Sequence, residues 1–109
     1  MDTVQAAVIK ARSAMLMDAP FFGTLALKLK LKEDDAVKTA ATDGRCFFYG
    51  AKFITQQTQQ QLRGLFAHEV MHCVLNHHTR RGSRKQEAWN VACDYAINPL
   101  LIKAGFILP

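Results

Sequence analysis

The chain lacks the features that would take it into or across a membrane. No apolar stretch in its 109 residues approaches the roughly 20 residues that a membrane-spanning helix needs. Residues 1–5 have neither the positive start nor the unbroken apolar core of a signal peptide. There is no CxxC pair, and the three cysteines (Cys46, Cys73 and Cys93) are an odd number, which argues against a disulfide framework. We therefore expect a cytoplasmic protein with free thiols.

A dense basic segment with interleaved aromatic residues is also missing. The formal net charge is +5, but the densest basic cluster, residues 80–85, is interrupted by Gly82 and Ser83 and has the composition of an exposed loop. The sequence therefore gives little support for nucleic-acid binding, because the charge is spread over ordinary surface lysines and arginines.

What the sequence does contain is enough apolar material for one core. Half of the residues are hydrophobic and 21% are charged, which is typical of a globular protein. We find no internal repeat and no linker. Residues 1–109 are therefore expected to form a single domain.

The first half of the chain predicts one helix and three strands. Apolar residues recur at helical spacing over 2–17, and a proline at position 20 ends that pattern. Leucines alternate with Ala26 and three lysines over 25–32, which predicts a strand with a solvated lysine face. Segments 36–42 and 45–49 predict two further strands, joined by a two-residue hairpin turn at Asp43-Gly44.

The second half predicts two longer helices. One begins at an N-cap threonine, Thr55 or Thr58, and runs to about His78. Its apolar residues do not lie on one stripe, so it should be covered on most sides, and Gly64 suggests close contact with a neighbouring strand. The other spans roughly 85–97; Asn98-Pro99 breaks it, and a short final helix continues through Lys103.

The motif His68-Glu69-Val70-Met71-His72 carries the chemistry. On a helix, positions i and i+4 project to the same side, so both imidazoles can bind one ion. Zinc accepts imidazole nitrogen, and it lowers the pKa of water toward about 7. Glu69 lies between the two histidines and can act as the general base that takes a proton from this metal-activated water.

A third protein ligand is expected, because catalytic zinc sites usually have three. His78 matches the spacing of the longer motif H-E-x-x-H-x-x-G-x-x-H, but Leu75 replaces the glycine at which that chain turns. Asp94 lies in an apolar helical segment, where a carboxylate needs a partner such as a metal, an arginine or a ligand histidine. We favour Asp94 over His78.

Two segments of the chain resemble a known family. Residues 67–81 read AHEVMHCVLNHHTRR and residues 89–98 read WNVACDYAIN. Together with the lead FFGT at 21–24, they resemble zincin-like metallopeptidase domains of the HExxH type, which often precede a von Willebrand factor A-like domain. The resemblance extends from about Pro20 to Pro109.

The resemblance implies a minimal zincin-like fold of the α+β class. Such a fold has a small mixed sheet, mainly antiparallel, packed on the HExxH helix, and a following helix that supplies the third ligand. By analogy with zincins whose third ligand is an acid on that later helix, Asp94 is the implied ligand. A von Willebrand factor A-like domain is an implied partner, separate or fused, that these 109 residues do not include.

Three functional hypotheses follow. The first is a zinc-dependent peptidase acting on a peptide or protein, with His68, His72 and Asp94 as ligands and Glu69 as base. The second is a catalytically silent zinc-binding module, structural or regulatory, with a closed site of four ligands. The third is a nucleic-acid-associated protein. The same ligand set also accepts iron, cobalt or nickel. Tyr95 or an arginine in 80–84 is a candidate for oxyanion stabilisation, and the roles of Asn90 and Asn98 stay open between the metal shell and backbone capping.

Overall fold

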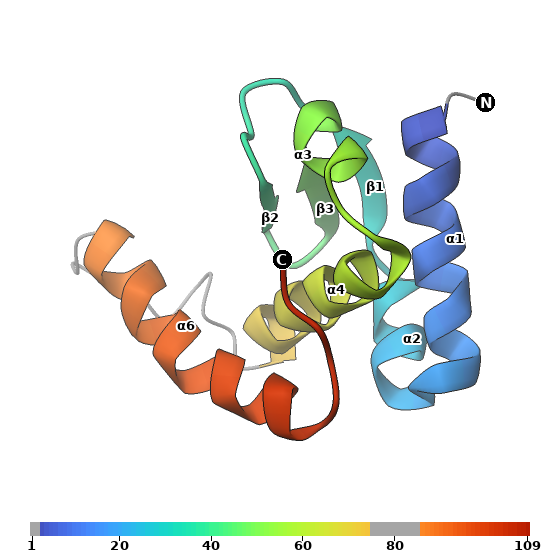
Figure 1. Ribbon diagram of the computed structural model, residues 1–109. Helices are drawn as coiled ribbons and strands as arrows, with labels where there is room; N and C mark the ends of the chain where they lie inside the picture. The colour runs from blue at the N-terminus through green and yellow to red at the C-terminus, as the bar shows by residue number, and fades with distance from the viewer. Residues whose placement is uncertain (1–2, 75–85) are drawn as a thin grey trace.

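Helices and a small sheet make up the structure, which confirms the expected α+β class. The computed structural model describes the backbone of residues 3–74 and 86–109, and the side chains in these ranges except those of residues 86–93 and 95. The elements are α1 (Thr3–Asp18), α2 (Pro20–Ala26), β1 (Lys30–Glu33), β2 (Ala40–Thr42), β3 (Cys46–Tyr49), α3 (Ala51–Thr55), α4 (Gln59–Val74) and α6 (Gln86–Lys103). Helix α4 lies in the middle and packs against α1, α2, α6 and β2 (Figure 1).

The sheet is small and mixed, as expected, but it is not mainly antiparallel. Strand β3 is central, in the order β1-β3-β2. It pairs in parallel with β1, from Lys30↔Cys46 to Glu33↔Tyr49, and antiparallel with β2, from Ala40↔Tyr49 to Thr42↔Phe47. The hairpin signal in the sequence reports only the β2–β3 pair, because the β1–β3 pair joins segments that are not neighbours along the chain.

The strand predicted over 25–32 is wrong for most of its length. Helix α2 includes the first two of these residues, and β1 begins only at Lys30. Pro20 occupies the first turn of α2, where proline is favoured, so it starts a helix as well as ending one. Leucine, alanine and lysine are good helix formers, so this composition also suits a helix. The alternation of leucines did not correspond to one buried face, because Leu29 is buried but Leu27 is exposed. The lysines at 28, 30 and 32 are exposed, as expected.

The hairpin forms with shorter strands and a wider turn than predicted. Thr42 pairs with Phe47, so residues 43–46 lie between the paired positions. Gly44 has a φ of 91°, as the turn prediction requires. The carboxylate of Asp43 accepts hydrogen bonds from the backbone N–H groups of Cys46 and Arg45, at 2.8 and 2.9 Å, and these bonds hold the pKa of Asp43 below its usual value.

Helix α4 begins at a capping box. The backbone N–H of Gln61 donates to Oγ1 of Thr58 at 3.1 Å, and the N–H of Thr58 donates to Oε1 of Gln61 at 2.9 Å. Of the two predicted caps Thr58 is therefore the correct one, and Thr55 ends the separate helix α3. The predicted continuation to His78 lies outside the described residues.

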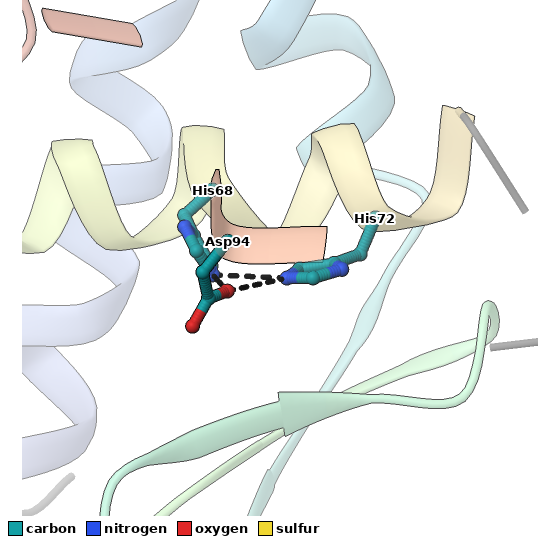
Figure 2. A group of neighbouring side chains, drawn as sticks. All are labelled: His68, His72 and Asp94. Atoms are coloured by element: carbon teal, nitrogen blue, oxygen red, sulfur yellow. Dashed lines mark hydrogen bonds and ion pairs between the residues drawn. The ribbon is translucent and has the colours of Figure 1, made fainter. Parts of the chain in front are cut away.

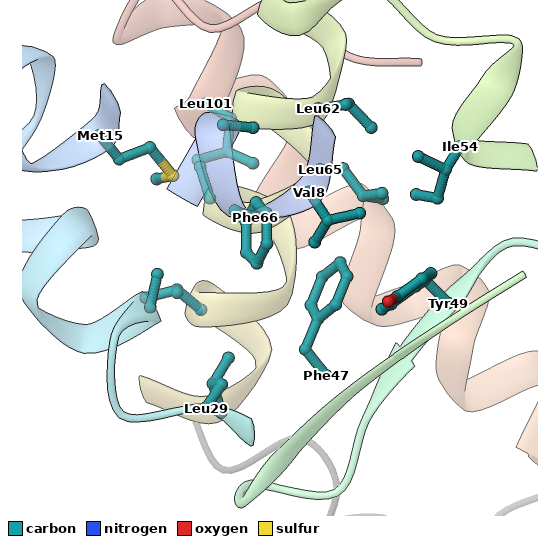
Figure 3. Packing of buried hydrophobic residues seen from close by; sticks show 14 of the residues in the cluster. Val8, Met15, Leu29, Phe47, Tyr49, Ile54, Leu62, Leu65, Phe66 and Leu101 are labelled. Carbon is teal, nitrogen blue, oxygen red and sulfur yellow. The ribbon is translucent and has the colours of Figure 1, made fainter. Parts of the chain in front are cut away.

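The core forms around the first half of α4 (Figure 3). Phe66 of α4 stacks on Phe47 of β3, with ring centroids 4.3 Å apart and planes inclined by 22°. Consecutive residues of α4 from Gly64 to Ala67 are buried, which confirms that the helix is covered on most sides. The largest fully buried side chains come from several elements: Val8, Met15, Phe47, Leu62, Phe66, Val70, Ile97 and Leu101.

Gly64 contacts the C-terminal segment and not a strand, which corrects the expectation. A β-carbon at this position would collide with the carbonyl oxygen of Ile107. Residues 106–109 cross α4 here, close to its backbone (Figure 1). The glycine is therefore required by a close backbone approach, whose partner is distant in sequence.

Helix α6 runs through Pro99, so the predicted break is wrong, although the predicted end at Lys103 is correct. An interior proline removes a helical hydrogen bond at a cost of about 3 kcal/mol. Ile97 and Leu101, on either side of it, are fully buried in the core and hold both parts of the helix in place. Within residues 3–74 and 86–109, no helix is both long and apolar enough to cross a membrane.

Candidate metal centre

Three side chains from two helices converge on one point (Figure 2). His68 and His72 lie one turn apart on α4, and their Nε2 atoms are 2.9 Å from each other. Asp94, on α6, places Oδ1 3.1 Å from Nε2 of His68 and 3.5 Å from Nε2 of His72. The structure thus brings together the two motif histidines and the favoured third residue. The competing candidate, His78, lies outside the described residues.

The spacing of these three atoms fits a zinc ion. Ligand atoms about 2.0–2.1 Å from a tetrahedral zinc are roughly 3.3 Å from one another. The observed separations of 2.9, 3.1 and 3.5 Å bracket that value. Two imidazole nitrogens and one carboxylate oxygen are also ligands that zinc accepts, and lone pairs at this separation require a proton or a cation between them. The residues present therefore fit a divalent cation.

The cluster is open to solvent on the side of Asp94. The side chain of Asp94 is 47% exposed, whereas those of His68 and His72 are 17% and 15% exposed. Among the described residues three side chains converge here, whereas a closed structural site has four protein ligands around the ion.

Glu69 adds a buried carboxyl group to this region. Only 6% of the residue is exposed, although both of its histidine neighbours in the motif are partly accessible. Burial raises the pKa of Glu69 to about 8, and the negative charge of Asp94 adds to the rise. In the metal-free protein this carboxyl group therefore holds a proton at neutral pH.

Asn98 contacts the other ring nitrogen of His68. Its Oδ1 lies 2.9 Å from Nδ1 of His68. The sequence left Asn98 and Asn90 as equal candidates for a role near the metal shell; the structure brings Asn98 into contact, and the side chain of Asn90 is not among those described. No sequence signal distinguishes the two asparagines, because each lies four residues from Asp94, Asn90 before it and Asn98 after it.

Cys73 links the helix to the edge strand, a role that the sequence did not indicate. Its Sγ lies 3.4 Å from Oγ1 of Thr42 on β2. The residue is half-buried, and burial raises the pKa of its thiol. Cys46 and Cys73 are both free, and the side chain of Cys93 is not among those described. The side chain of Tyr95, proposed for the oxyanion, is outside the described set.

Comparison with known proteins supports a metal-dependent peptidase family. A family model described as "putative metallopeptidase domain" matches residues 3–109. No curated protein and no solved structure gives a significant match to the chain. The matched region contains the two histidines, Glu69 and Asp94, together with nearly all of the remaining sequence. The chain therefore belongs to this family of metallopeptidase domains.

Proposed function

We propose that the protein is a zinc-dependent metallopeptidase that hydrolyses peptide bonds with Glu69 as general base. The observation that carries the proposal is the convergence of His68, His72 and Asp94 at zinc-ligand spacing, open to solvent and next to a buried carboxyl group. Family membership supports the reaction class.

The three converging side chains would hold the cation. His68 and His72 would each contribute Nε2, and Asp94 would contribute Oδ1. When bound, a zinc ion would acidify a water molecule, polarise the scissile carbonyl group and favour the ionised form of Glu69. Asp94 also offsets part of the positive charge and joins α6 to α4 at the site.

Glu69 would move the proton during hydrolysis. Its carboxylate accepts a proton from water as the water oxygen attacks the carbonyl carbon. The same proton then goes to the amide nitrogen as the C–N bond breaks, which leaves a carboxylic acid and an amine. Burial suits this role, because desolvation increases the affinity of the carboxylate for the proton that it accepts.

The alternative, a zinc-binding module without turnover, predicts a closed site. The exposure of Asp94 favours the enzyme, because it leaves one side of the cluster accessible. The two functions differ in one measurable respect. Both bind zinc, but only the enzyme cleaves peptide bonds in a Glu69-dependent way.

The test is Glu69→Gln in the zinc-loaded protein. Glutamine keeps the shape of the side chain but cannot accept the proton, so cleavage of a mixed peptide library should fall by about 10²–10⁴-fold, while zinc stoichiometry, measured by elemental analysis, stays the same. Glu33→Gln on β1 makes the same chemical change at an exposed position and should retain wild-type activity. Undiminished cleavage by Glu69→Gln would rule out this mechanism. Zinc binding without any cleavage by the wild-type protein would favour the silent module.

A further inference from the structure

We infer that Asn98 is a positioning residue that orients the His68 ring and presents its Nε2 atom to the metal. The inference rests on the metal-binding part of the proposed function and does not require peptidase activity. It assigns a role to a side chain outside the HExxH motif.

The His68 ring is held at both of its nitrogens by one helix. Nδ1 lies 2.9 Å from Oδ1 of Asn98, and Nε2 lies 3.1 Å from Oδ1 of Asp94. Asp94 and Asn98 are four residues apart on α6, so they lie on the same face of that helix, one turn apart. The ring edge is therefore placed between two successive turns of α6.

The hydrogen-bond chemistry then determines which nitrogen is free to bind. A neutral imidazole has one N–H and one lone pair, and the binding nitrogen must carry the lone pair. An amide oxygen only accepts, so contact with Oδ1 of Asn98 requires the hydrogen of His68 to be on Nδ1. Nε2 is then left with its lone pair toward His72 and Asp94, the arrangement that a cation shared by the three atoms requires.

The amide group achieves this without adding charge. The site already contains the carboxyl groups of Asp94 and Glu69, and the pKa of Glu69 is raised in part by Asp94. A neutral partner for His68 orients the ring but adds no further negative charge there. The backbone of Asn98 is fixed as well, since Ile97 and Leu101 on the same helix are fully buried.

Two variants of Asn98 with nearly the same shape distinguish the effect of its hydrogen-bond acceptor from the effect of its packing. Asn98→Leu removes the acceptor, and zinc affinity, measured by competition with a chelator, should fall by about 10–100-fold. Asn98→Asp keeps an acceptor oxygen and should bind zinc at least as tightly as the wild type. Leu100→Ala changes an exposed side chain on the same helix and should leave zinc affinity unchanged.

Nitrogen-15 NMR of the histidine rings tests the orientation directly. In the zinc-loaded wild-type protein, His68 should show a slowly exchanging Nδ1–H, and this signal should be lost in Asn98→Leu. The wild-type spectrum alone is decisive if Asn98→Leu does not fold, because a His68 ring without a protected Nδ1–H would overturn the inference.

Three other results would also overturn it. These are unchanged zinc affinity in Asn98→Leu, an equal loss in both Asn98 variants, and a comparable loss in Leu100→Ala. The last two would point to helix packing as the cause. Affinity and NMR signals do not depend on turnover, so a protein that cleaves nothing could still confirm the role of Asn98, and an active peptidase could still refute it.

Discussion

The two halves of α4 have the same backbone geometry but different surroundings. From Gln59 to Ala67 the helix packs against α1, the sheet and the C-terminal segment; Leu62 and residues 64–67 are buried, and Phe66 stacks on Phe47. From His68 to Val74, Glu69 and Val70 are still buried, but His68 and His72 are partly exposed and face Asp94 of α6, and Cys73 contacts β2. The comparison shows how one helix can serve as a core element and as a ligand platform. The enclosed half fixes the helix axis, and the fixed axis places the two imidazoles.

Glu69 stands at the boundary between the halves and should show the largest effect. Its pKa is raised in the metal-free folded protein from 4.5 to about 8, so the folded state binds more protons than the unfolded state between these values. The free energy of unfolding should therefore fall as pH rises from about 5 to 8, by roughly 3–5 kcal/mol. Denaturant titration of the metal-free protein at several pH values measures this change.

Glu69→Gln provides the reference for that measurement. The glutamine side chain at position 69 is neutral at every pH. The free energy of unfolding of the variant should therefore match that of the wild type near pH 5 and exceed it near pH 8. All other ionisable groups are common to both proteins, so the difference between the two curves isolates Glu69. If the free energy of unfolding changed with pH in the same way in both proteins, burial would not raise the pKa of Glu69.

Stabilisation of the protein by zinc should depend on the second half of α4 and not on the first. At a free zinc concentration about 100 times the dissociation constant, the free energy of unfolding should rise by about 3 kcal/mol. Asp94→Ala removes one converging atom and should abolish this rise at the same zinc concentration. Asp18→Ala removes a carboxylate that pairs with Arg63 in the first half and should leave the zinc response intact. An undiminished response in Asp94→Ala would exclude Asp94 as a ligand.

A larger side chain at Gly64, in the first half of α4, should lower the stability of the protein. Gly64→Ala places a β-carbon against the carbonyl oxygen of Ile107 and should lower the free energy of unfolding by about 1–3 kcal/mol. Zinc affinity of the folded variant should not change, because the site lies beyond this contact. Gln60→Ala, at an exposed position one turn earlier, is the control. A stabilised Gly64→Ala protein would show that the C-terminal segment can move aside.

The candidate site was more predictable from sequence than the fold. His68 and His72 depend on a local rule, the i to i+4 spacing of a helix, and Asp94 stood out as a carboxylate in an apolar segment. The parallel pairing of β1 with β3 and the contact at Gly64 depend on partners distant in sequence, which no local pattern specifies. Pro99 was misjudged because burial of its helical neighbours outweighs its local preference.

The position of Asp94 on a different helix from the histidines gives the site a mechanical role. An ion held by both helices would act as a cross-link between segments more than twenty residues apart in the chain. A chelator would then remove the cross-link as well as the ion that takes part in catalysis. The packing of α6 against α4 would weaken at the same time as activity is lost. Metal supply would thus set the rigidity of the molecule along with its reactivity.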